Sequence, residues 1–359
     1  MKTLPPPSEM YRALVARDAT YDGSFFAAIR TTGVFCRPGC GARRPRPENV
    51  EYFATAQEAE RRGYRACRRC RPLEPVLSNP PWAERMIALA EGAGGERISA
   101  GDLRRSGIDP VRAARWCRRR YGMTFRAWAR SRRLAGTLEA IRGGTPVTEA
   151  ALESGFESES GFRDAFVRLF GVPPTRAAAE GRGVVRVRWL ATPLGTMLAA
   201  AGEEGVGLLE FADRRALKSQ IAALRRHFPL PVVPGTNAHL DRLAEELEGY
   251  FAGVRRTFDV PLAVRGTPFQ VAVWERLRRI PPGTTCSYAD LARELGRPSA
   301  LRAVARANGQ NRIAILVPCH RVIGSDGSPT GYGGGVWRKL RLLALEREGP
   351  HFPLRGGSR

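Results

Sequence analysis

The segment "SYADLARELGRPSALRAVARANGQNRIAILVPCHRVIG" runs from Ser287 to Gly324. Ser287 is placed to cap a first helix, and Gly296 with Pro298 can form the turn before a second. The apolar run that closes the segment contains Cys319 and His320. The sequence therefore predicts a helix, a turn and a second helix, followed by an apolar stretch that carries a thiol.

The thiol of Cys319 has two interpretations. Free cysteines are among the most buried residues, so a packing role is the simpler one. A nucleophile with His320 as its base is the other, although adjacent side chains point to opposite sides of an extended chain. The pair alone does not decide between them.

A longer stretch, from Gly266 to Glu346, closely resembles the catalytic domain of O6-alkylguanine-DNA alkyltransferases, including the C-terminal half of the Ada family. The resemblance implies that Cys319 accepts a methyl group and that His320 is its base, acting through a water molecule. Glu346 would hold the histidine tautomer and stabilise its charged form. Asn311 would tie the segment before Cys319 to the rest of the site.

The same resemblance implies how the segment meets DNA. Its helix–turn–helix unit would bind the minor groove, Arg302 would fill the space of a flipped base, and Tyr288 would rotate the phosphate. Tyr332 and Gly333 would form the base pocket, where the glycines of Gly333–Gly335 let backbone approach the base. Flipping is required because a thiolate cannot reach the O6 methyl group inside a duplex.

The implied reaction is an SN2 transfer from O6-methylguanine, and by the resemblance from O4-methylthymine, to sulfur. The product is a thioether without a facile leaving group, so each cysteine works once. The chain is thus expected to be a single-turnover methylated-DNA–protein-cysteine methyltransferase.

Four other cysteines occur as two close pairs near the N-terminus, namely Cys36, Cys40, Cys67 and Cys70. The C-x3-C and C-x2-C spacings favour one Zn2+ held by four thiolates over disulfides in a reducing compartment. Arginines flank both pairs, which suggests that the site docks on phosphates.

The stretch "YDGSFFAAIRTTGVFCRPGCGARRPRPENVEYFATAQEAERRGYRACRRCRP" is similar to the N-terminal domain of the Ada family. In that family the first zinc-bound cysteine takes a methyl group from a methylated DNA phosphate, which here implies Cys36. Thr32 and Arg43 would lie near the DNA. Methylation of Cys36 would lower the negative charge of the site and increase DNA binding, so the reaction could act as a switch.

Between these parts, Gly101–Arg142 contains 12 Arg and three acidic residues. Asp109 with Gly122, and Ser158 with Gly171, delimit two predicted helices. The region resembles the AraC-type double helix-turn-helix domain that the Ada family carries here. Its first unit departs from that family at Asp109, Ala113 and Cys117, which thins the apolar face, and Glu157 and Glu159 place acids where a recognition helix begins.

Two seams divide the 359 residues, at Pro72–Pro81 and at Thr175–Gly183. They predict a multidomain α+β chain with a small four-cysteine zinc domain (1–78), an all-α AraC-type double helix-turn-helix domain (79–180) and an alkyltransferase domain (181–359). The last is expected to combine an α/β subdomain (181–265) with a helical catalytic subdomain (266–355).

The formal net charge is +23, and only three of the 58 basic residues are lysine. Such a surplus favours a polyanionic partner, and arginine suits phosphate and guanine. We therefore expect double-stranded DNA carrying these lesions, promoter DNA and RNA polymerase as partners of a monomer. Without an apolar run of about 20 residues or a signal peptide, a cytoplasmic location with no membrane contact is expected.

The expected function is repair through Cys319 and Cys36, with Cys36 methylation converting the chain into an activator of the response to alkylation. Two alternatives stay open. One is a repair protein without specific operator binding, which the altered first helix-turn-helix unit allows. The other is a zinc-containing transcription regulator without catalysis, which the intact set around Cys319 disfavours.

Overall fold

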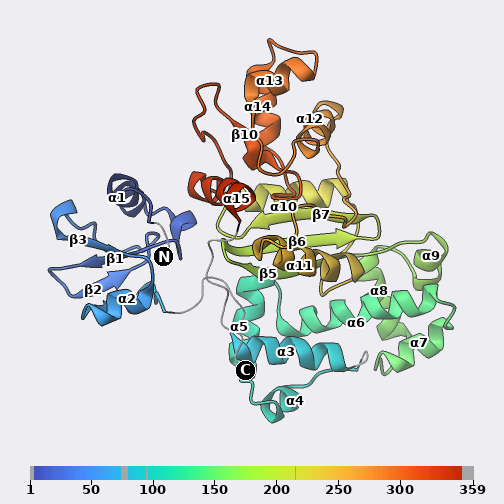
Figure 1. Cartoon of the computed structure of the whole chain (residues 1–359). Helices are drawn as coiled ribbons and strands as arrows, with labels where there is room; N and C mark the ends of the chain where they lie inside the picture. The colour runs from blue at the N-terminus through green and yellow to red at the C-terminus, as the bar shows by residue number, and fades with distance from the viewer. Residues whose placement is uncertain (1–3, 74–79, 94–95, 215, 350–359) are drawn as a thin grey trace.

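A computed structural model describes residues 4–73, 80–93, 96–214 and 216–349, which form three bodies in chain order (Figure 1). Much of the first predicted seam, residues 74–79, lies outside the described residues. Within the described ranges, no helix is long and apolar enough to cross a membrane.

The N-terminal body is a four-stranded sheet in the order β3-β1-β2-β4, with two helices. Strand β2 lies between antiparallel β1 and parallel β4, and its last residue, Cys36, pairs with Ala27 of β1. Thr55 caps the second helix in a capping box with Glu58. The elements are α1 (Pro7–Ala16), η1 (Ala19–Tyr21), β1 (Phe26–Ile29), β2 (Val34–Cys36), η2 (Pro47–Asn49), β3 (Val50–Phe53), α2 (Ala56–Arg61) and β4 (Arg65–Ala66).

The middle body is entirely helical in its described residues and contains two helix-turn-helix units, α4–α5 and α7–α8, joined by the long α6 (Figure 1). Asp109 caps α5 and Gly122 ends it in the left-handed conformation, as predicted; Ser158 and Gly171 do the same for α8. The helices are α3 (Pro81–Gly92), α4 (Ala100–Arg105), α5 (Pro110–Tyr121), α6 (Phe125–Arg142), α7 (Val147–Glu153), α8 (Glu159–Phe170) and α9 (Pro174–Ala179).

The first helix-turn-helix unit has a complete core despite its small residues. Ala113 and Cys117 are fully buried, and the rings of Trp82, Trp116 and Trp128 belong to the same cluster. The bulky indoles therefore fill the volume that Ala113 and Cys117 leave. Cys117, Trp116 and Trp128 are core residues.

The C-terminal body begins with a four-stranded sheet in the order β7-β6-β5-β8, on which α10 and α11 pack. A helical part follows and carries the Cys319 turn. The elements are β5 (Val185–Thr192), β6 (Gly195–Gly202), β7 (Gly205–Phe211), α10 (Leu217–His227), β8 (Val232–Pro234), α11 (Ala238–Phe251), α12 (Pro268–Arg278), β9 (Cys286–Ser287), α13 (Tyr288–Glu294), α14 (Leu301–Gly309), η3 (Cys319–Arg321), β10 (Val322–Ile323) and α15 (Val336–Glu348).

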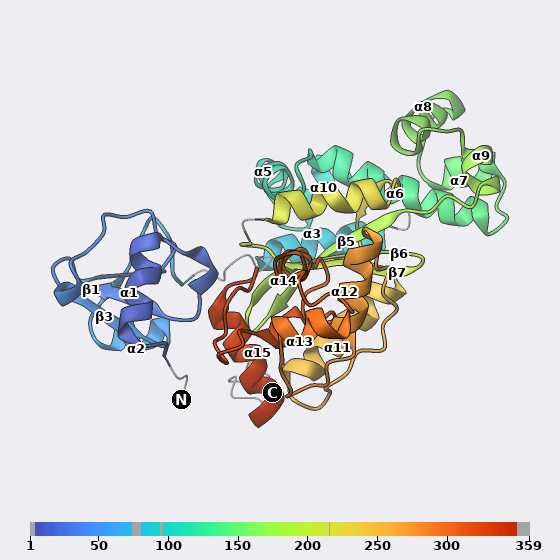
Figure 2. The ribbon, with the colours of Figure 1, turned by 90° about the horizontal axis from the view of Figure 1, so that it is seen from above.

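The N-terminal body packs against α15, and Figures 1 and 2 place the two side by side. The rings of Tyr21 and Trp337 lie 6.0 Å apart, and buried residues of both bodies share one apolar cluster. A Cβ added at Gly335 would lie 2.8 Å from the hydroxyl oxygen of Thr20. The first body therefore rests close to the Gly333–Gly335 run.

The middle body contacts the first strand of the C-terminal sheet. Arg186 pairs with Glu139 at 2.6 Å, and the Arg120 guanidinium lies 4.0 Å from the centre of the Trp189 ring. The second predicted seam is partly structured, because α9 occupies its first half and buries Ala177 completely. The apolar face of "PTRAAA" explains the difference, since it packs on α6 and α8.

Candidate functional site

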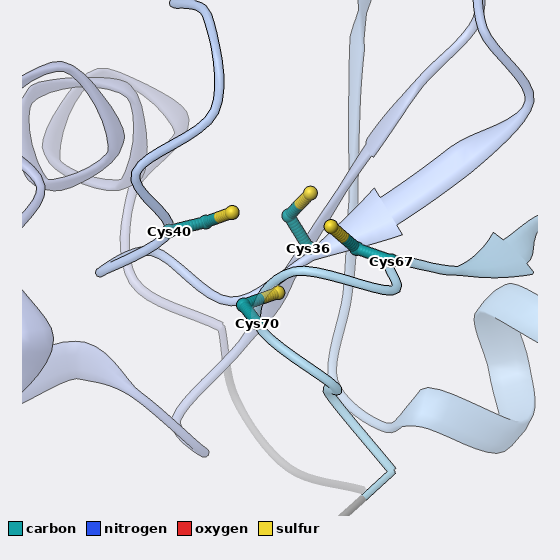
Figure 3. Close-up of side chains that lie close together, drawn as sticks. All are labelled: Cys36, Cys40, Cys67 and Cys70. Atoms are coloured by element: carbon teal, nitrogen blue, oxygen red, sulfur yellow. The ribbon is translucent and has the colours of Figure 1, made fainter.

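The four N-terminal cysteines converge from separate turns of the chain. Cys36 ends β2, Cys40 lies in the loop after it, and Cys67 and Cys70 follow β4. Their Sγ atoms all lie within 4.8 Å of one another, and Figure 3 shows the sulfurs pointing toward a common centre. Tetrahedral Zn2+ with bonds of about 2.3 Å needs sulfurs roughly 3.8 Å apart. The geometry fits one such ion.

The pKa shifts of the clustered thiols are also consistent with a site for a cation. Hydrogen bonds from the other thiols, first that of Cys36, lower the pKa of Cys70 to about 5, and the backbone N–H of Arg37 lies 3.4 Å from its sulfur. The same shared bond and burial raise the pKa of Cys36 well above its usual value. Negative charge is thus favoured at the Cys70 sulfur and disfavoured at that of Cys36, and a bound cation would favour the thiolate form of both.

Asp22, which follows η1, holds the loop that carries Cys40. The Asp22 carboxylate accepts the backbone N–H of Gly39 at 2.7 Å. Gly39 is required there because an added Cβ would lie 2.9 Å from the backbone of Ala19. This support orients the loop that presents the second cysteine.

The arginines around the cluster divide into two groups. Arg69 donates to the carbonyl of Gly41 at 2.7 Å, and Arg37 to that of Arg71 at 3.0 Å, so these two hold the ligand loops together. Arg43, Arg44, Arg46 and Arg68 are exposed, and so is Arg69 itself. Thr32 is exposed as well. Two arginines of the shell therefore stabilise the cysteine loops, a role that the sequence did not reveal.

Cys319 is 7% exposed and begins the short helix η3. The Nδ2 atom of Asn311 lies 3.1 Å from its Sγ and 2.7 Å from the carbonyl oxygen of Val317. Asn311 Oδ1 accepts the N–H of Ile313 at 2.9 Å. This one side chain holds a turn in which Ile315 has a φ of 74°, a strained value for a β-branched residue.

Beside the thiol, His320 and Glu346 form a fully buried pair in which Nε2 lies 2.9 Å from Oε1. The Glu346 carboxylate also accepts from the Tyr250 hydroxyl at 2.8 Å, from the Arg321 guanidinium at 2.8 Å and from the N–H of Gly283 at 3.1 Å. Because Nε2–H donates to the carboxylate, Nδ1 is the basic nitrogen of His320. In the described part of the chain Nδ1 has no hydrogen-bond partner.

The pKa shifts fit a neutral acid–base pair. Burial raises the pKa of Cys319, and the Asn311 hydrogen bond opposes that shift. Burial lowers the pKa of His320, opposed by Glu346. Burial alone would raise the pKa of Glu346, but hydrogen bonds from His320 and Arg321 hold it well below its usual range. At neutral pH the thiol is protonated and the imidazole is free to take its proton.

A small cavity of about 10 Å³ adjoins Cys319, enough for roughly one water molecule. The walls are formed by Glu210, Arg214, Asn308, Gly309, Ala314, Cys319 and the loop Gly331–Gly334, which includes Tyr332 and Gly333. A Cβ added at Gly333 would lie 2.5 Å from the Arg214 guanidinium, so this glycine makes room for an arginine.

The helix–turn–helix unit that the sequence predicted in this body is α13–α14. Ser287 caps α13 in a capping box with Asp290, as the sequence predicted. Arg302 is exposed near the start of α14. Tyr288 is half-buried, and its hydroxyl lies 3.4 Å from the Gly331 carbonyl of the cavity wall. A side chain of α13 thus contacts the wall of the cavity directly.

Sequence reasoning gave no chemical role to residues 184–264, yet three of them reach the site. Glu210 and Arg214 form a buried ion pair in the cavity wall, and Tyr250 contacts Glu346. Arg214 also donates to the carbonyl of Asn311 at 3.2 Å, which holds the residue beside the thiol. No local pattern marks these residues, because the sheet brings them to the site from about 100 residues away.

In the middle body, the two acidic residues at the predicted start of the second recognition helix are paired. Glu157 lies 3.4 Å from Arg97, and Glu159 lies 3.2 Å from Arg163. Exposed arginines of α5 are Arg112, Arg115, Arg118 and Arg119. The first unit therefore presents the more basic surface.

Three family models match the chain. Residues 9–73 match the metal binding domain of Ada, residues 103–179 a helix-turn-helix domain, and residues 268–348 the DNA binding domain of 6-O-methylguanine DNA methyltransferase.

Among known proteins, the chain is 33% identical to the bifunctional transcriptional activator/DNA repair enzyme Ada of Escherichia coli (strain K12), over 95% of this chain and 96% of that protein. It is 43% identical to a methylated-DNA–protein-cysteine methyltransferase of Mycobacterium tuberculosis (strain H37Rv), over 46% and 93%. A crystal structure of Mycobacterium tuberculosis OGT in complex with DNA matches at 40% identity and a TM-score of 0.41, covering 46% of this chain and 95% of that one.

Proposed function

The chain belongs to the Ada family, and on that premise we propose which of its residues carry out the family's reactions. It is a DNA-binding methylated-DNA–protein-cysteine methyltransferase with a metal-binding domain and a transcription-regulating helix-turn-helix domain. Cys319 accepts the methyl group of O6-methylguanine, and of O4-methylthymine, while Cys36 accepts that of methyl phosphotriesters.

Two observations support the first assignment: the Asn311 amide lies 3.1 Å from the Cys319 sulfur, and the next residue, His320, pairs with Glu346 and keeps Nδ1 without a partner among the described residues. The Cys319 thiol gives its proton through a water molecule to His320 Nδ1. The thiolate attacks the methyl carbon, a C–S bond forms, and the C–O bond breaks with its electron pair on guanine O6. The proton returns from His320 to the base, so repaired guanine leaves neutral. Glu346 stabilises the imidazolium in between.

At the first site, bound zinc would keep Cys36 as a thiolate near neutral pH. Cys36 is 6% exposed and is the last residue of strand β2. Transfer of the methyl group to its sulfur restores the negative charge of the phosphate and removes one from the cysteines. Exposed Arg43 and Thr32 are proposed to contact the neighbouring DNA.

Arg302 and Tyr288 are the proposed base-flipping residues. Their place on α13–α14, next to the cavity lined by Tyr332 and Gly333, supports the assignment. The proposed domains remain 1–78, 79–180 and 181–359, the last divided near residue 265.

Methylation of Cys36 is proposed to increase promoter binding by the middle domain and thereby activate transcription through RNA polymerase. The lower negative charge of the cluster supports this, because DNA is a polyanion. A monomer in the cytoplasm is proposed, since the large exposed apolar side chains of the described residues lie on separate elements.

Two experiments test the proposal. Cys319→Ala should abolish transfer from O6-methylguanine duplexes and leave phosphotriester transfer intact; full O6-methylguanine activity would refute the first assignment. Promoter affinity should rise after Cys36 is methylated. An unchanged affinity would favour the alternative in which the chain only repairs DNA.

A further inference from the structure

Among the side chains that line the cavity beside Cys319, two carry buried polar atoms without a partner in the described chain. These are Oδ1 of Asn308 and the hydroxyl of Tyr332. Asn308 is only 3% exposed. A buried acceptor without a partner is costly, so its presence in a cavity wall points to a ligand that supplies a donor.

The orientation of the Asn308 amide follows from its neighbour. The Tyr288 hydroxyl lies 3.4 Å from the Gly331 carbonyl and 3.3 Å from Asn308 Nδ2. A carbonyl only accepts, so the single hydroxyl proton goes to Gly331 and the hydroxyl oxygen accepts from Asn308. Both contacts are made only when Nδ2 faces Tyr288, which leaves Oδ1 as the unused acceptor.

The side-chain carboxylate of the wall, that of Glu210, is already engaged. The carboxylate of Glu210 receives the N–H of Phe211 at 2.9 Å and the guanidinium of Arg214. Arg214 in turn donates to the carbonyls of Asn311 and Gly309. Of these two side-chain acceptors in the wall, Asn308 Oδ1 is therefore the one available to a base.

We propose that Asn308 is a specificity residue whose Oδ1 accepts a hydrogen bond from the 2-amino group of flipped O6-methylguanine. This inference rests on the proposed function of Cys319. O6-methylation removes the proton from N1, so the 2-amino group is the only N–H donor left on that base. O4-methylthymine has no N–H donor at all, and so Asn308 favours the guanine lesion over the thymine lesion.

The test combines a change in the protein with a change of one group in the base. Single-turnover methyl transfer to the full chain is measured with duplexes that contain O6-methylguanine or O6-methylhypoxanthine, which lacks the 2-amino group. The wild-type protein should react about tenfold more slowly with O6-methylhypoxanthine. Asn308→Leu should react with both bases at rates within about twofold, because the acceptor is gone.

Asn308→Asp keeps an acceptor at the same place and should retain the preference for the 2-amino group. Gln310→Leu is the matched control, since it removes an amide two residues away that bonds Gln270 and does not line the cavity. For Gln310→Leu, the ratio of the rate with O6-methylguanine to the rate with O6-methylhypoxanthine should equal that of the wild type.

The inference is overturned if the wild type shows no preference, a result that needs no variant to fold. It is also overturned if Asn308→Leu keeps the tenfold preference. Failure of the proposed function looks different, because the wild type would then transfer no methyl group from O6-methylguanine either.

Discussion

The side-chain amide of Asn311 connects the thiol of Cys319 to the strained turn before it, with Nδ2 3.1 Å from Sγ. Burial raises the pKa of Cys319, and this hydrogen bond is the strongest influence that opposes the rise. Asn311 is therefore expected to tune the nucleophile as well as to hold its position.

Replacing Asn311 with alanine should raise the pKa of Cys319 further and slow methyl transfer about tenfold or more. It should also cost about 1–3 kcal/mol in the free energy of unfolding, because the N–H of Ile313 and the carbonyl of Val317 lose a partner. The pH dependence of Cys319 alkylation measures the first effect and thermal melting the second. An unchanged alkylation profile in a destabilised variant would mean that Asn311 is only structural.

The pair His320–Glu346 predicts a specific pH dependence. Burial lowers the pKa of His320 below its ordinary 6.5, so transfer should be level near neutral pH and fall only as His320 becomes protonated at lower pH. Glu346 opposes that shift, and Glu346→Gln should therefore move the acidic limb to still lower pH while slowing the plateau. Single-turnover rates between about pH 5 and pH 8 measure both.

The same variant leaves Arg321 buried without its carboxylate, so a loss of about 3–5 kcal/mol in stability is expected. Glu275→Gln, in an exposed pair with Arg278, is the control and should change neither rate nor stability appreciably. An acidic limb that stays in place in Glu346→Gln would contradict the assignment of Glu346 to His320.

Removing the metal should separate the two reactions. A chelator, or Cys70→Ser, should abolish phosphotriester transfer and leave transfer from O6-methylguanine within about twofold, since Cys319 lies outside the cluster. Metal analysis should find one zinc per chain in the wild type and in the control Cys286→Ser. Zinc retained at full stoichiometry by Cys70→Ser would contradict the four-cysteine site.

The first helix-turn-helix unit is expected to supply phosphate contacts. Arg115→Gln and Arg119→Gln should each lower the slope of log affinity against log salt by about 0.9, because one phosphate contact is lost. Arg176→Gln, at an arginine paired with Glu180 on α9, should leave the slope unchanged. Equal slopes for all variants would place the DNA on another face of the middle body.

The sequence was most informative where structure is local. Asp109, Ser158 and Ser287 cap helices because their side chains bond backbone two or three residues away, and such signals need no tertiary contact. The four-cysteine metal site could be predicted for a similar reason. Within each close pair, the short spacing alone places two thiols near each other.

Contacts between distant segments escaped prediction. Tyr250 reaches Glu346 across 96 residues, and Arg214 reaches Asn311 across 97. The glycine run shows the same limit. The approach of its backbone to a base stays a prediction, while Gly333 also makes room for Arg214 and Gly335 for Thr20 of the first body, contacts that the sequence did not reveal. Local sequence patterns do not predict how one body packs against another.

Two cysteines of this chain are proposed to accept one methyl group each, from two different lesions. Peptide mass spectrometry of the full chain, after incubation with duplexes that carry a single kind of lesion, tests this proposal. O6-methylguanine duplexes should methylate only the peptide with Cys319, and methyl phosphotriester duplexes only the peptide with Cys36. Methylation of the Cys117 or Cys286 peptide instead, or of neither predicted cysteine, would contradict the account.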